Sequence, residues 1–210
     1  MEHINSWRDS GEVFEHQIRL NNYELQSSYP NHWKHFIKSL DFLTLKHNVN
    51  RIVDIGCGAG VYSELARRHF PRLSYLGYDY SENALQVAKK SWPDSKFKLG
   101  KYQDLSSSDF NEGDVLVANG LLDILPNGDK ALERLLSLSC KFVILQRINI
   151  TEAVSSHNVY RAYDVIETYE YHHNITVFSN LLNQYGYSCK DDEYIDSPNT
   201  AINVLIIKND

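Results

Sequence analysis

Three glycines and one aspartate have the types and the spacing needed to bind a nucleoside. The stretch IVDIGCGAG, residues 52–60, places Gly56, Gly58 and Gly60 at alternate positions directly after a short apolar run. Because glycine lacks a Cβ, the backbone of such a loop can approach a ligand closely and present its N–H groups. Asp79 follows roughly twenty residues beyond the loop, where an acidic side chain can accept hydrogen bonds from ribose hydroxyls. Together these features predict a nucleoside site.

The residues around the loop indicate which nucleoside it binds. The dinucleotide fingerprint G-x-G-x-x-G/A has Val61 at its sixth position here, which argues against an NAD-dependent oxidoreductase. Asp54 precedes the first glycine by two residues, and its carboxylate would repel a diphosphate but suits a cationic ammonium group. An adenosine with an amino-acid tail meets both demands. The alternative is a tight strand-to-helix turn with no ligand, but a plain connection needs one glycine and no carboxylate.

The elements that must position these residues alternate along the chain. Apolar spacing of three and four residues predicts helices, at residues 12–20, 33–45, 61–70, 81–92, 129–139 and 176–187. Apolar and β-branched runs predict strands, at residues 51–56, 73–79, 96–100, 114–119, 141–147, 188–196 and 201–208. The last two strands are separated by a turn at Ser197-Pro198-Asn199. Residues 148–173 are rich in tyrosine and histidine and are expected to be irregular.

This alternation predicts an α/β fold with a doubly wound, mostly parallel, seven-stranded sheet and helices on both faces. The last two strands have no helix between them, so we expect an antiparallel hairpin at one edge of the sheet. In such sheets ligands bind beyond the carboxyl ends of the strands, which is where the glycine loop and Asp79 fall. Residues 1–47 are predicted to form an N-terminal helical cap or lid, and residues 48–210 the nucleoside-binding domain.

Composition excludes several classes of protein. The net charge of −6 gives no basic footprint for a nucleic-acid backbone. Cys57, Cys140 and Cys189 match neither a disulfide framework nor a zinc pattern, so no metal is expected and a reducing compartment is the simplest interpretation. No apolar run approaches the length of a membrane span or a signal peptide. We therefore expect a cytoplasmic protein.

The chain resembles the class I S-adenosylmethionine-dependent methyltransferases, with a Rossmann-like fold. VDIGCGAG matches that family's first motif, and YDYSENALQVAKK is similar to its second strand and helix. KLGKYQDL resembles the segment on the adenine side, and DVLVANGLLDIL the fourth-strand motif beside the methyl donor. LLNQYGYS followed by AINVLIIK is similar to the closing helix, the turn and the antiparallel edge strand. The resemblance spans about residues 48 to 208.

The resemblance implies S-adenosylmethionine as cofactor and a role for each matching residue. The glycines, with Cys57 between them, would line the methionine and ribose, and Asp54 would lie near the ammonium group. Asp79 would hold the ribose. The adenine would lie against Tyr80 and near Tyr102 and Gln103, and the sulfonium end would be bordered by Asn119 and Gly120. Two departures stand out: Lys101 replaces an acidic residue on the adenine side, and the glycine pair common before the fifth strand is missing.

Methyl transfer to a hydroxyl or an amine also requires a base and a closed site. His172, His173 and His32 are the candidate bases, because an unperturbed imidazole titrates near neutral pH. Residues 1–35 and 148–173 are the segments that could form a lid. The tetrad N-P-P-Y is absent after the fourth strand, where ANGL stands, which argues against a base of nucleic acid as the acceptor. The leading prediction is a small-molecule acceptor with a hydroxyl or carboxyl oxygen.

Two further interpretations stay open from sequence. The protein could be a catalytically silent binder that keeps the nucleoside pocket and regulates a partner. The stretch rich in tyrosine and histidine could equally form a homodimer surface, since aromatic residues are enriched in the cores of interfaces.

Overall fold

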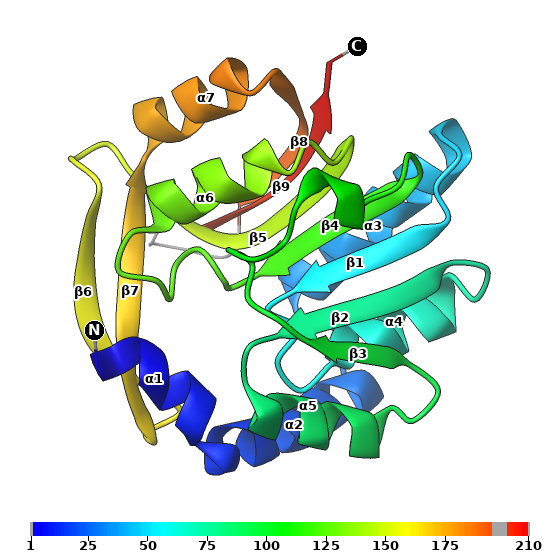
Figure 1. Ribbon diagram of the computed structural model, residues 1–210, viewed down its shortest axis with the longest axis vertical. Helices are drawn as coiled ribbons and strands as arrows, with labels where there is room; N and C mark the ends of the chain where they lie inside the picture. Colours follow the sequence, from blue (N-terminus) through cyan, green and yellow to red (C-terminus); the bar gives the residue numbers. More distant parts are fainter. Residues whose placement is uncertain (1, 195–200, 210) are drawn as a thin grey trace.

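The fold is built on one mixed sheet. The computed structural model describes residues 2–194 and 201–209. Five strands are parallel neighbours in the order β3-β2-β1-β4-β5, and β9 then pairs antiparallel with β5 and with β8. These strands are β1 (Arg51–Ile55), β2 (Ser74–Asp79), β3 (Lys96–Leu99), β4 (Asp114–Asn119), β5 (Phe142–Thr151), β8 (Tyr187–Tyr194) and β9 (Ala201–Lys208). The predicted mostly parallel sheet with its antiparallel edge is confirmed (Figure 1), and two strands beyond the predicted seven, β6 (Ser156–Ala162) and β7 (Ile166–Asn174), extend it to nine among the described residues. The Ser197–Asn199 turn lies outside the described residues.

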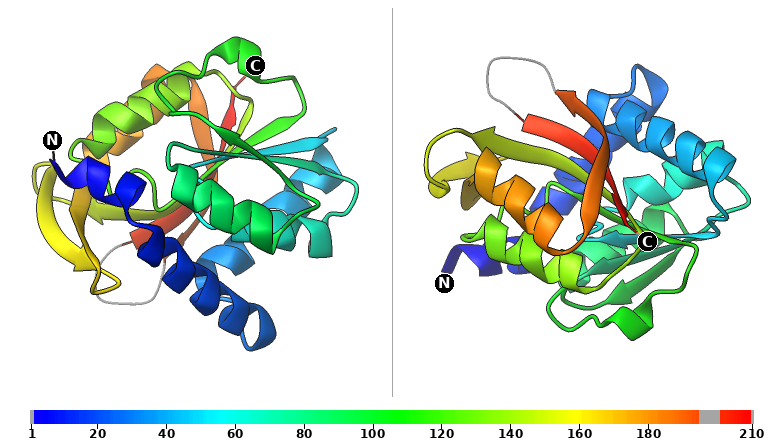
Figure 2. Two further views of the ribbon diagram at one scale, coloured as in Figure 1. Left: turned by 60° about the horizontal axis from the view of Figure 1, so that its bottom comes forward. Right: turned by 90° about the horizontal axis from the view of Figure 1, so that it is seen from above.

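Helices cover both faces of this sheet (Figure 2). One face packs against α3 and α4 through a core that includes Trp33, Phe36 and Leu65. The other face packs against α6 and α7 through Leu132 and Phe178. The bounds are α3 (Asn31–Lys46), α4 (Val61–His69), α5 (Glu82–Ser91), α6 (Gly128–Ser137) and α7 (Ile175–Gln184). None of the helices in the described residues combines the length and apolar content of a membrane span.

Helix caps fix the ends of the loops that surround the carboxyl edge of the sheet. The Ser81 hydroxyl accepts a hydrogen bond from Ala84 N at the start of α5, as its sequence position predicts. The Asn127 side chain caps α6 by accepting a bond from Lys130 N. Asn174 caps α7 in the same way, through Thr176 N and Val177 N. Satisfied first-turn N–H groups let these helices begin at defined residues beside the site.

The N-terminal segment divides into two parts. α3 is a layer of the main fold, because Trp33, Phe36, Leu40 and Leu43 are buried against the sheet. α1 (Glu2–Asp9) and α2 (Gly11–Gln26) instead cross the carboxyl edge of the sheet, where α1 contacts β7 and both helices contact α5 (Figure 1). Among the described residues 2–47, α1 and α2 therefore lie where the predicted lid would, whereas α3 does not.

Residues 148–173 are not irregular, which corrects the expectation from sequence. β5 continues to Thr151, and β6 (Ser156–Ala162) and β7 (Ile166–Asn174) form an antiparallel hairpin. The hairpin joins the sheet where β7 pairs with the end of β5, at Ile150 opposite His173. β6 is exposed along most of its length, so its sequence carries no apolar alternation.

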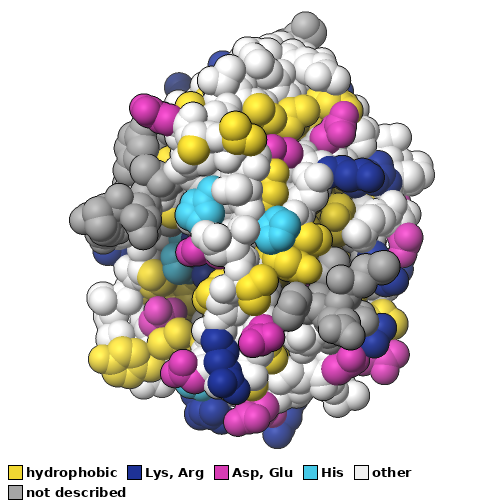
Figure 3. Space-filling view, turned by 90° about the vertical axis from the view of Figure 1, so that its left-hand side faces the viewer, with side chains coloured by type: hydrophobic (Ala, Val, Ile, Leu, Met, Phe, Trp, Pro, Cys, Tyr) yellow, Lys and Arg dark blue, Asp and Glu magenta, His cyan; other side chains and the backbone are white. Residues whose placement is uncertain are grey.

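The face formed by the hairpin carries histidine and hydrophobic side chains at the surface (Figure 3). Val154 is 85% exposed and Val159 is 50% exposed, which is unusual for side chains of this kind. The homodimer surface predicted for this stretch stays a prediction.

Candidate functional site

The glycine loop between β1 and α4 is fixed to the end of β2. Gly56 N and Cys57 N both donate to Tyr78 O, at 2.8 and 3.0 Å. Gly58 N donates to Asp79 Oδ2 at 2.8 Å. All three glycines of the loop have positive φ, between 52° and 79°, a region that other residues rarely adopt. The loop therefore needs glycine for its backbone conformation as well as for close approach.

Each glycine makes room for a different neighbour. A Cβ on Gly60 would lie 2.8 Å from the Phe97 ring, and a Cβ on Gly58 would lie 2.6 Å from Gln17 Oε1. Gln17 in α2 is held there because its Oε1 accepts a hydrogen bond from Ala59 N at 2.8 Å. Gly60 thus allows the loop to pack on β3, and Gly58 allows α2 to contact the loop.

Asp79 links the loop, the end of β2 and the cavities. Its Oδ1 accepts from Ser81 N at 2.9 Å, and its Oδ2 from Gly58 N. The side chain is buried, and this burial raises the pKa of Asp79 above its usual range, while the backbone donors oppose the shift. Each carboxylate oxygen has a second lone pair, and Asp79 lines both cavities described below. It can therefore still accept hydrogen bonds from a ligand.

The first cavity has a volume of about 700 Å³, within the usual range for small-molecule sites of roughly 300–1,000 Å³. It lies beyond the carboxyl ends of β1, β2 and β3. Its walls include Gly56, Tyr80, Tyr102 and Gln103, together with Leu121 and Ile124 from the segment after β4. Strand-end backbone and apolar side chains thus surround a space whose strand-end wall carries the carboxylate of Asp79, while Glu133 and four basic side chains line its other walls.

The second cavity, of about 320 Å³, adjoins the first and shares Asp79, Tyr80 and Leu121 with it. Segments far apart in the sequence form its walls. These wall residues include Trp7, Phe14 and Gln17 of α1 and α2, Gly58 of the loop, Asn119 to Leu121 and Asp123 after β4, Arg147 of β5, and Tyr160 to Tyr163. Both segments predicted as lids therefore line this cavity.

Three of the residues predicted to bind the cofactor line neither cavity. Asp54 alternates with Val53 and Ile55, so its side chain lies on the face covered by α3 and α4, where its Oδ2 accepts from Tyr75 OH at 2.6 Å. Burial raises the pKa of Asp54 to about 7. Cys57 is buried under the loop against Gly77, and Gly60 packs on Phe97. The roles implied for these three residues stay predictions.

Two of the predicted bases lie outside both cavities. His32 is largely buried; its burial, aided by the positive charge of Arg147, lowers the pKa of His32 to about 3. At neutral pH it is uncharged and a weak base. His172 lies on β7 with its Nε2 3.4 Å from Glu170 Oε2. Neither side chain lines a cavity.

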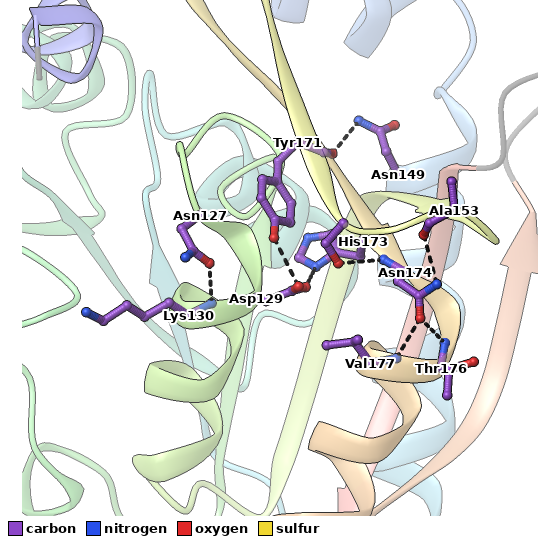
Figure 4. Close-up of polar contacts among 11 residues, drawn as sticks. Asn127, Asp129, Lys130, Asn149, Ala153, Tyr171, His173, Asn174, Thr176 and Val177 are labelled. Atoms are coloured by element: carbon purple, nitrogen blue, oxygen red, sulfur yellow. Dashed lines mark hydrogen bonds and ion pairs between the residues drawn. The ribbon is translucent and has the colours of Figure 1, made fainter.

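His173 is fully buried between β7 and α6 (Figure 4). Its Nδ1 lies 2.6 Å from Asp129 Oδ1, and Tyr171 OH donates to Asp129 Oδ2 at 3.0 Å. Its Nε2 is buried without a hydrogen-bond partner among the described residues. This network connects the hairpin to the start of α6 and lines neither cavity, so catalysis by His173 stays a prediction that the geometry does not favour.

Sequence reasoning missed three charged residues of the second cavity, Asp123, Arg147 and the exposed Arg161. Arg147 closes the predicted fifth strand, and its place at a carboxyl end was the available signal. Asp123 lies in the segment DVLVANGLLDIL, which pointed only to Asn119 and Gly120. Arg8 and Gln17 were also missed, because a helix far from the loop in sequence gives no sign of the residue that it presents there.

Comparisons with known proteins agree with the fold. A family model described as a methyltransferase domain matches residues 46–185. Trans-aconitate 2-methyltransferase of Variovorax paradoxus strain S110 is 33% identical over 85 residues, which are 40% of this chain and 32% of that protein. The chain thus spans about a third of the length of the curated relatives it matches.

Solved structures share the fold at low sequence identity. An S-adenosylmethionine-dependent methyltransferase from Clostridium acetobutylicum superposes with a TM-score of 0.64 at 11% identity, covering 93% of this chain and 99% of that one. Magnesium protoporphyrin IX methyltransferase from Synechocystis PCC 6803, with bound S-adenosylmethionine, superposes with a TM-score of 0.59 at 16% identity. The match covers 98% of this chain and 91% of that one.

Proposed function

The chain belongs to the class I S-adenosylmethionine-dependent methyltransferases, and from this premise we propose that it methylates an oxygen of a small-molecule acceptor. The observation that carries the proposal is the pair of adjoining cavities at the carboxyl edge of the sheet. They share Asp79, Tyr80 and Leu121, so that two ligands bound in them would lie side by side. A group-transfer enzyme needs this arrangement.

The residues of the first cavity fit S-adenosylmethionine. Asp79 would accept hydrogen bonds from the ribose, and Gly56, together with Gly58 at the second cavity, would let the loop backbone approach the ligand. Tyr80, Tyr102 and Gln103 would surround the adenine. Asn119 and Gly120 line the second cavity, where they would border the sulfonium end. The three positive-φ glycines and a buried carboxylate with lone pairs to spare are the features that support this fit.

The bound cofactor supplies an electrophilic methyl group on a cationic sulfur. The chain's own contribution is to orient the acceptor and to exclude water. α1 and α2 cover the cavities as a lid in this proposal: Trp7 Nε1 donates to Thr168 Oγ1 at 2.7 Å and so connects α1 with the hairpin. Trp7 also lines both cavities, so a closed lid would hold both ligands.

A carboxyl oxygen is the acceptor atom that we favour. A carboxylate is already ionised at neutral pH and needs no base, and neither cavity is lined by a histidine among the described residues. The relatives named trans-aconitate 2-methyltransferase support an acid as acceptor, although the match covers only part of each. A hydroxyl acceptor would require a base such as Asp123, whose pKa burial raises.

Two measurements test this function. Calorimetric titration should show binding of S-adenosylhomocysteine and none of NADH; the reverse result would remove the proposed activity. Incubation with methyl-labelled donor and a panel of small acids and alcohols should then label an acid. A methyl ester releases its label as methanol in mild alkali, whereas a methyl ether does not. Tight donor binding with no labelled product would instead favour a catalytically silent binding protein.

A further inference from the structure

Arg147 is directed into the second cavity by an irregularity in β5. The register between β5 and β9 shifts between Leu145 and Ile148, so one extra residue is inserted in β5. Arg147 takes a φ of 59°, which is uncommon for a residue other than glycine. A bulge changes the direction of a side chain that strand alternation would otherwise fix. Here it directs an arginine to the wall that would face the acceptor.

Neighbouring residues fix the position of the Arg147 guanidinium. Its Nε donates to Asn119 Oδ1 at 3.0 Å, and its backbone N donates to Asn203 Oδ1 at 3.2 Å. A Cβ at position 120 would overlap Arg147 Nη2, so Gly120 provides the space that the guanidinium occupies. The Nε atom is thus used for positioning, and the two Nη groups form no hydrogen bond or ion pair with the side chains that the structure describes.

The surroundings of Arg147 favour an anionic ligand. Phe14, Leu121 and Ile124 line the same cavity and limit its hydration. Asp123 lies in the cavity too, with its Oδ1 buried and without a hydrogen-bond partner among the described residues. Burial raises the pKa of Asp123, although the positive charge of Arg147 opposes the shift, and a protonated carboxyl can donate a hydrogen bond. A planar guanidinium fork matches a carboxylate in geometry and charge.

The carboxylate held by Arg147 must differ from the one that is methylated. Hydrogen bonds from a guanidinium stabilise a full negative charge more than the neutral ester that forms from it. Arg147 on the reacting carboxylate would therefore oppose methyl transfer, because it would bind the ground state better than the transition state. The same contact with a second, unreactive carboxylate costs nothing at the reacting oxygen and orients the acceptor.

We propose that Arg147 binds a second carboxylate of the acceptor, so that the substrate is a small acid with at least two carboxyl groups, one held and one methylated. This inference rests on the proposed methyltransferase function and adds to it a specificity residue and a substrate class.

Matched pairs of acids test the proposal. Fumarate and crotonate share a trans double bond, and crotonate has a methyl group in place of one carboxylate; succinate and butyrate, and glutarate and valerate, extend the comparison. With the protein saturated with S-adenosylhomocysteine, calorimetry should show tighter binding of at least one dicarboxylate than of its monocarboxylate partner. Arg147→Asn should weaken that binding roughly 10- to 100-fold, because charge-assisted hydrogen bonds are lost. Asparagine tolerates positive φ, which protects the backbone of the bulge.

Two controls separate the possible failures. Arg72→Asn makes the same change in an exposed loop at the opposite edge of the sheet and should leave dicarboxylate binding unchanged. S-adenosylhomocysteine affinity should change less than threefold in Arg147→Asn, which shows that the variant is folded. Equal binding of both acids of every pair, or equal dicarboxylate binding by wild type and Arg147→Asn, would overturn the role of Arg147. Failure of the wild type to bind S-adenosylhomocysteine would overturn the methyltransferase proposal itself.

Discussion

The two cavities differ in the parts of the fold that build them. Both cavities reach Gly56, Asp79 and Tyr80 at the strand ends, and the first is completed by residues 100–103 after β3 and by α6. The second cavity is completed by α2, the β5 bulge and the β6–β7 hairpin, all of which are additions to the parallel sheet, and Trp7 of α1 lines both cavities. Segments of the parallel sheet's own fold complete the first site, and side chains on added elements complete the second.

The comparison suggests that the walls of the two cavities differ in how strongly they are tied to the sheet. A site built on strand ends depends on the same contacts that hold the sheet together, since Asp79 accepts hydrogen bonds from Gly58 N and Ser81 N. A site built on a hairpin and two terminal helices can change its side chains without altering those contacts. We therefore expect changes at the strand ends to affect stability and cofactor binding, and changes on the added elements that line only the second cavity to affect the acceptor alone.

The largest expected effect concerns Asp54, which lies buried beneath the glycine loop. Its folded-state pKa is about 7, whereas an unfolded aspartate titrates near 3.9. Between these values the folded protein holds a proton that the unfolded chain releases, so the free energy of unfolding falls as pH rises from about 4 to about 7. Asp54→Asn removes this pH dependence. The free energy of unfolding of the variant should therefore rise by about 3 kcal/mol relative to that of the wild type as the pH goes from 5 to 8.

Urea denaturation of both proteins across this pH range measures the difference. Other groups contribute to the pH dependence of each protein, since burial also raises the pKa of Asp79 and lowers that of His32. The contribution of His32 cancels when the two curves are subtracted, and that of Asp79 cancels in part, because its charge helps to raise the pKa of Asp54. Asp104→Asn, at an exposed position, is the matched control and should run parallel to wild type. A pH-independent difference between Asp54→Asn and wild type would show that the buried carboxyl does not carry a raised pKa.

The second effect sharpens the contrast between the cavities. Asp79→Ala should weaken S-adenosylhomocysteine binding by about 2 kcal/mol, roughly 30-fold, through loss of charge-assisted hydrogen bonds to the ribose. Asp79→Asn keeps the shape of the side chain and should lose less of the binding free energy. Calorimetry with both variants measures the change, and circular dichroism checks their fold. Because Arg147→Asn is expected to leave this affinity nearly unchanged, equal losses in the two variants would contradict the division between the cavities.

The sheet was predictable because its strands are apolar runs with strong local signals. β1, β2 and β4 are buried almost throughout. A short, continuous apolar segment between two helices is typical of a buried strand. The glycine loop followed from the strand that precedes it. Asp54 shows the limit of this reasoning, because the sequence does not tell which face of the sheet its side chain lies on. In the structure it lies on the face covered by α3 and α4, where the Tyr75 hydroxyl donates a hydrogen bond to its carboxylate.

The hairpin and the bulge were not predictable for related reasons. β6 is an exposed edge, and β7 buries polar residues such as Thr168 and His173 that hydropathy counts as exposed. The bulge at Arg147 depends on the register with β9, which lies more than fifty residues away in the chain. Local patterns contain no information about such a pairing, so the second cavity emerges only from the folded structure.

The smallest effect concerns the hydrogen bond that connects α1 with the β6–β7 hairpin, two elements at the second cavity. Trp7 Nε1 donates to Thr168 Oγ1 at 2.7 Å, and Thr168 is only 1% exposed. Thr168→Val keeps the shape but leaves the indole N–H without this acceptor, at a cost of about 1 kcal/mol. Global unfolding should change little, because α1 lies outside the sheet and its two main cores and can open while the sheet stays folded. Amide hydrogen exchange within α1 should instead accelerate about fivefold, since opening becomes easier by that free energy.

Thr44→Val is the matched control, because the Thr44 hydroxyl bonds only within its own helix, to Leu40 O and Asp41 O. Equal exchange of α1 in the two variants would mean that packing of Trp7 against Phe14 and Tyr163 holds the helix without the hydrogen bond.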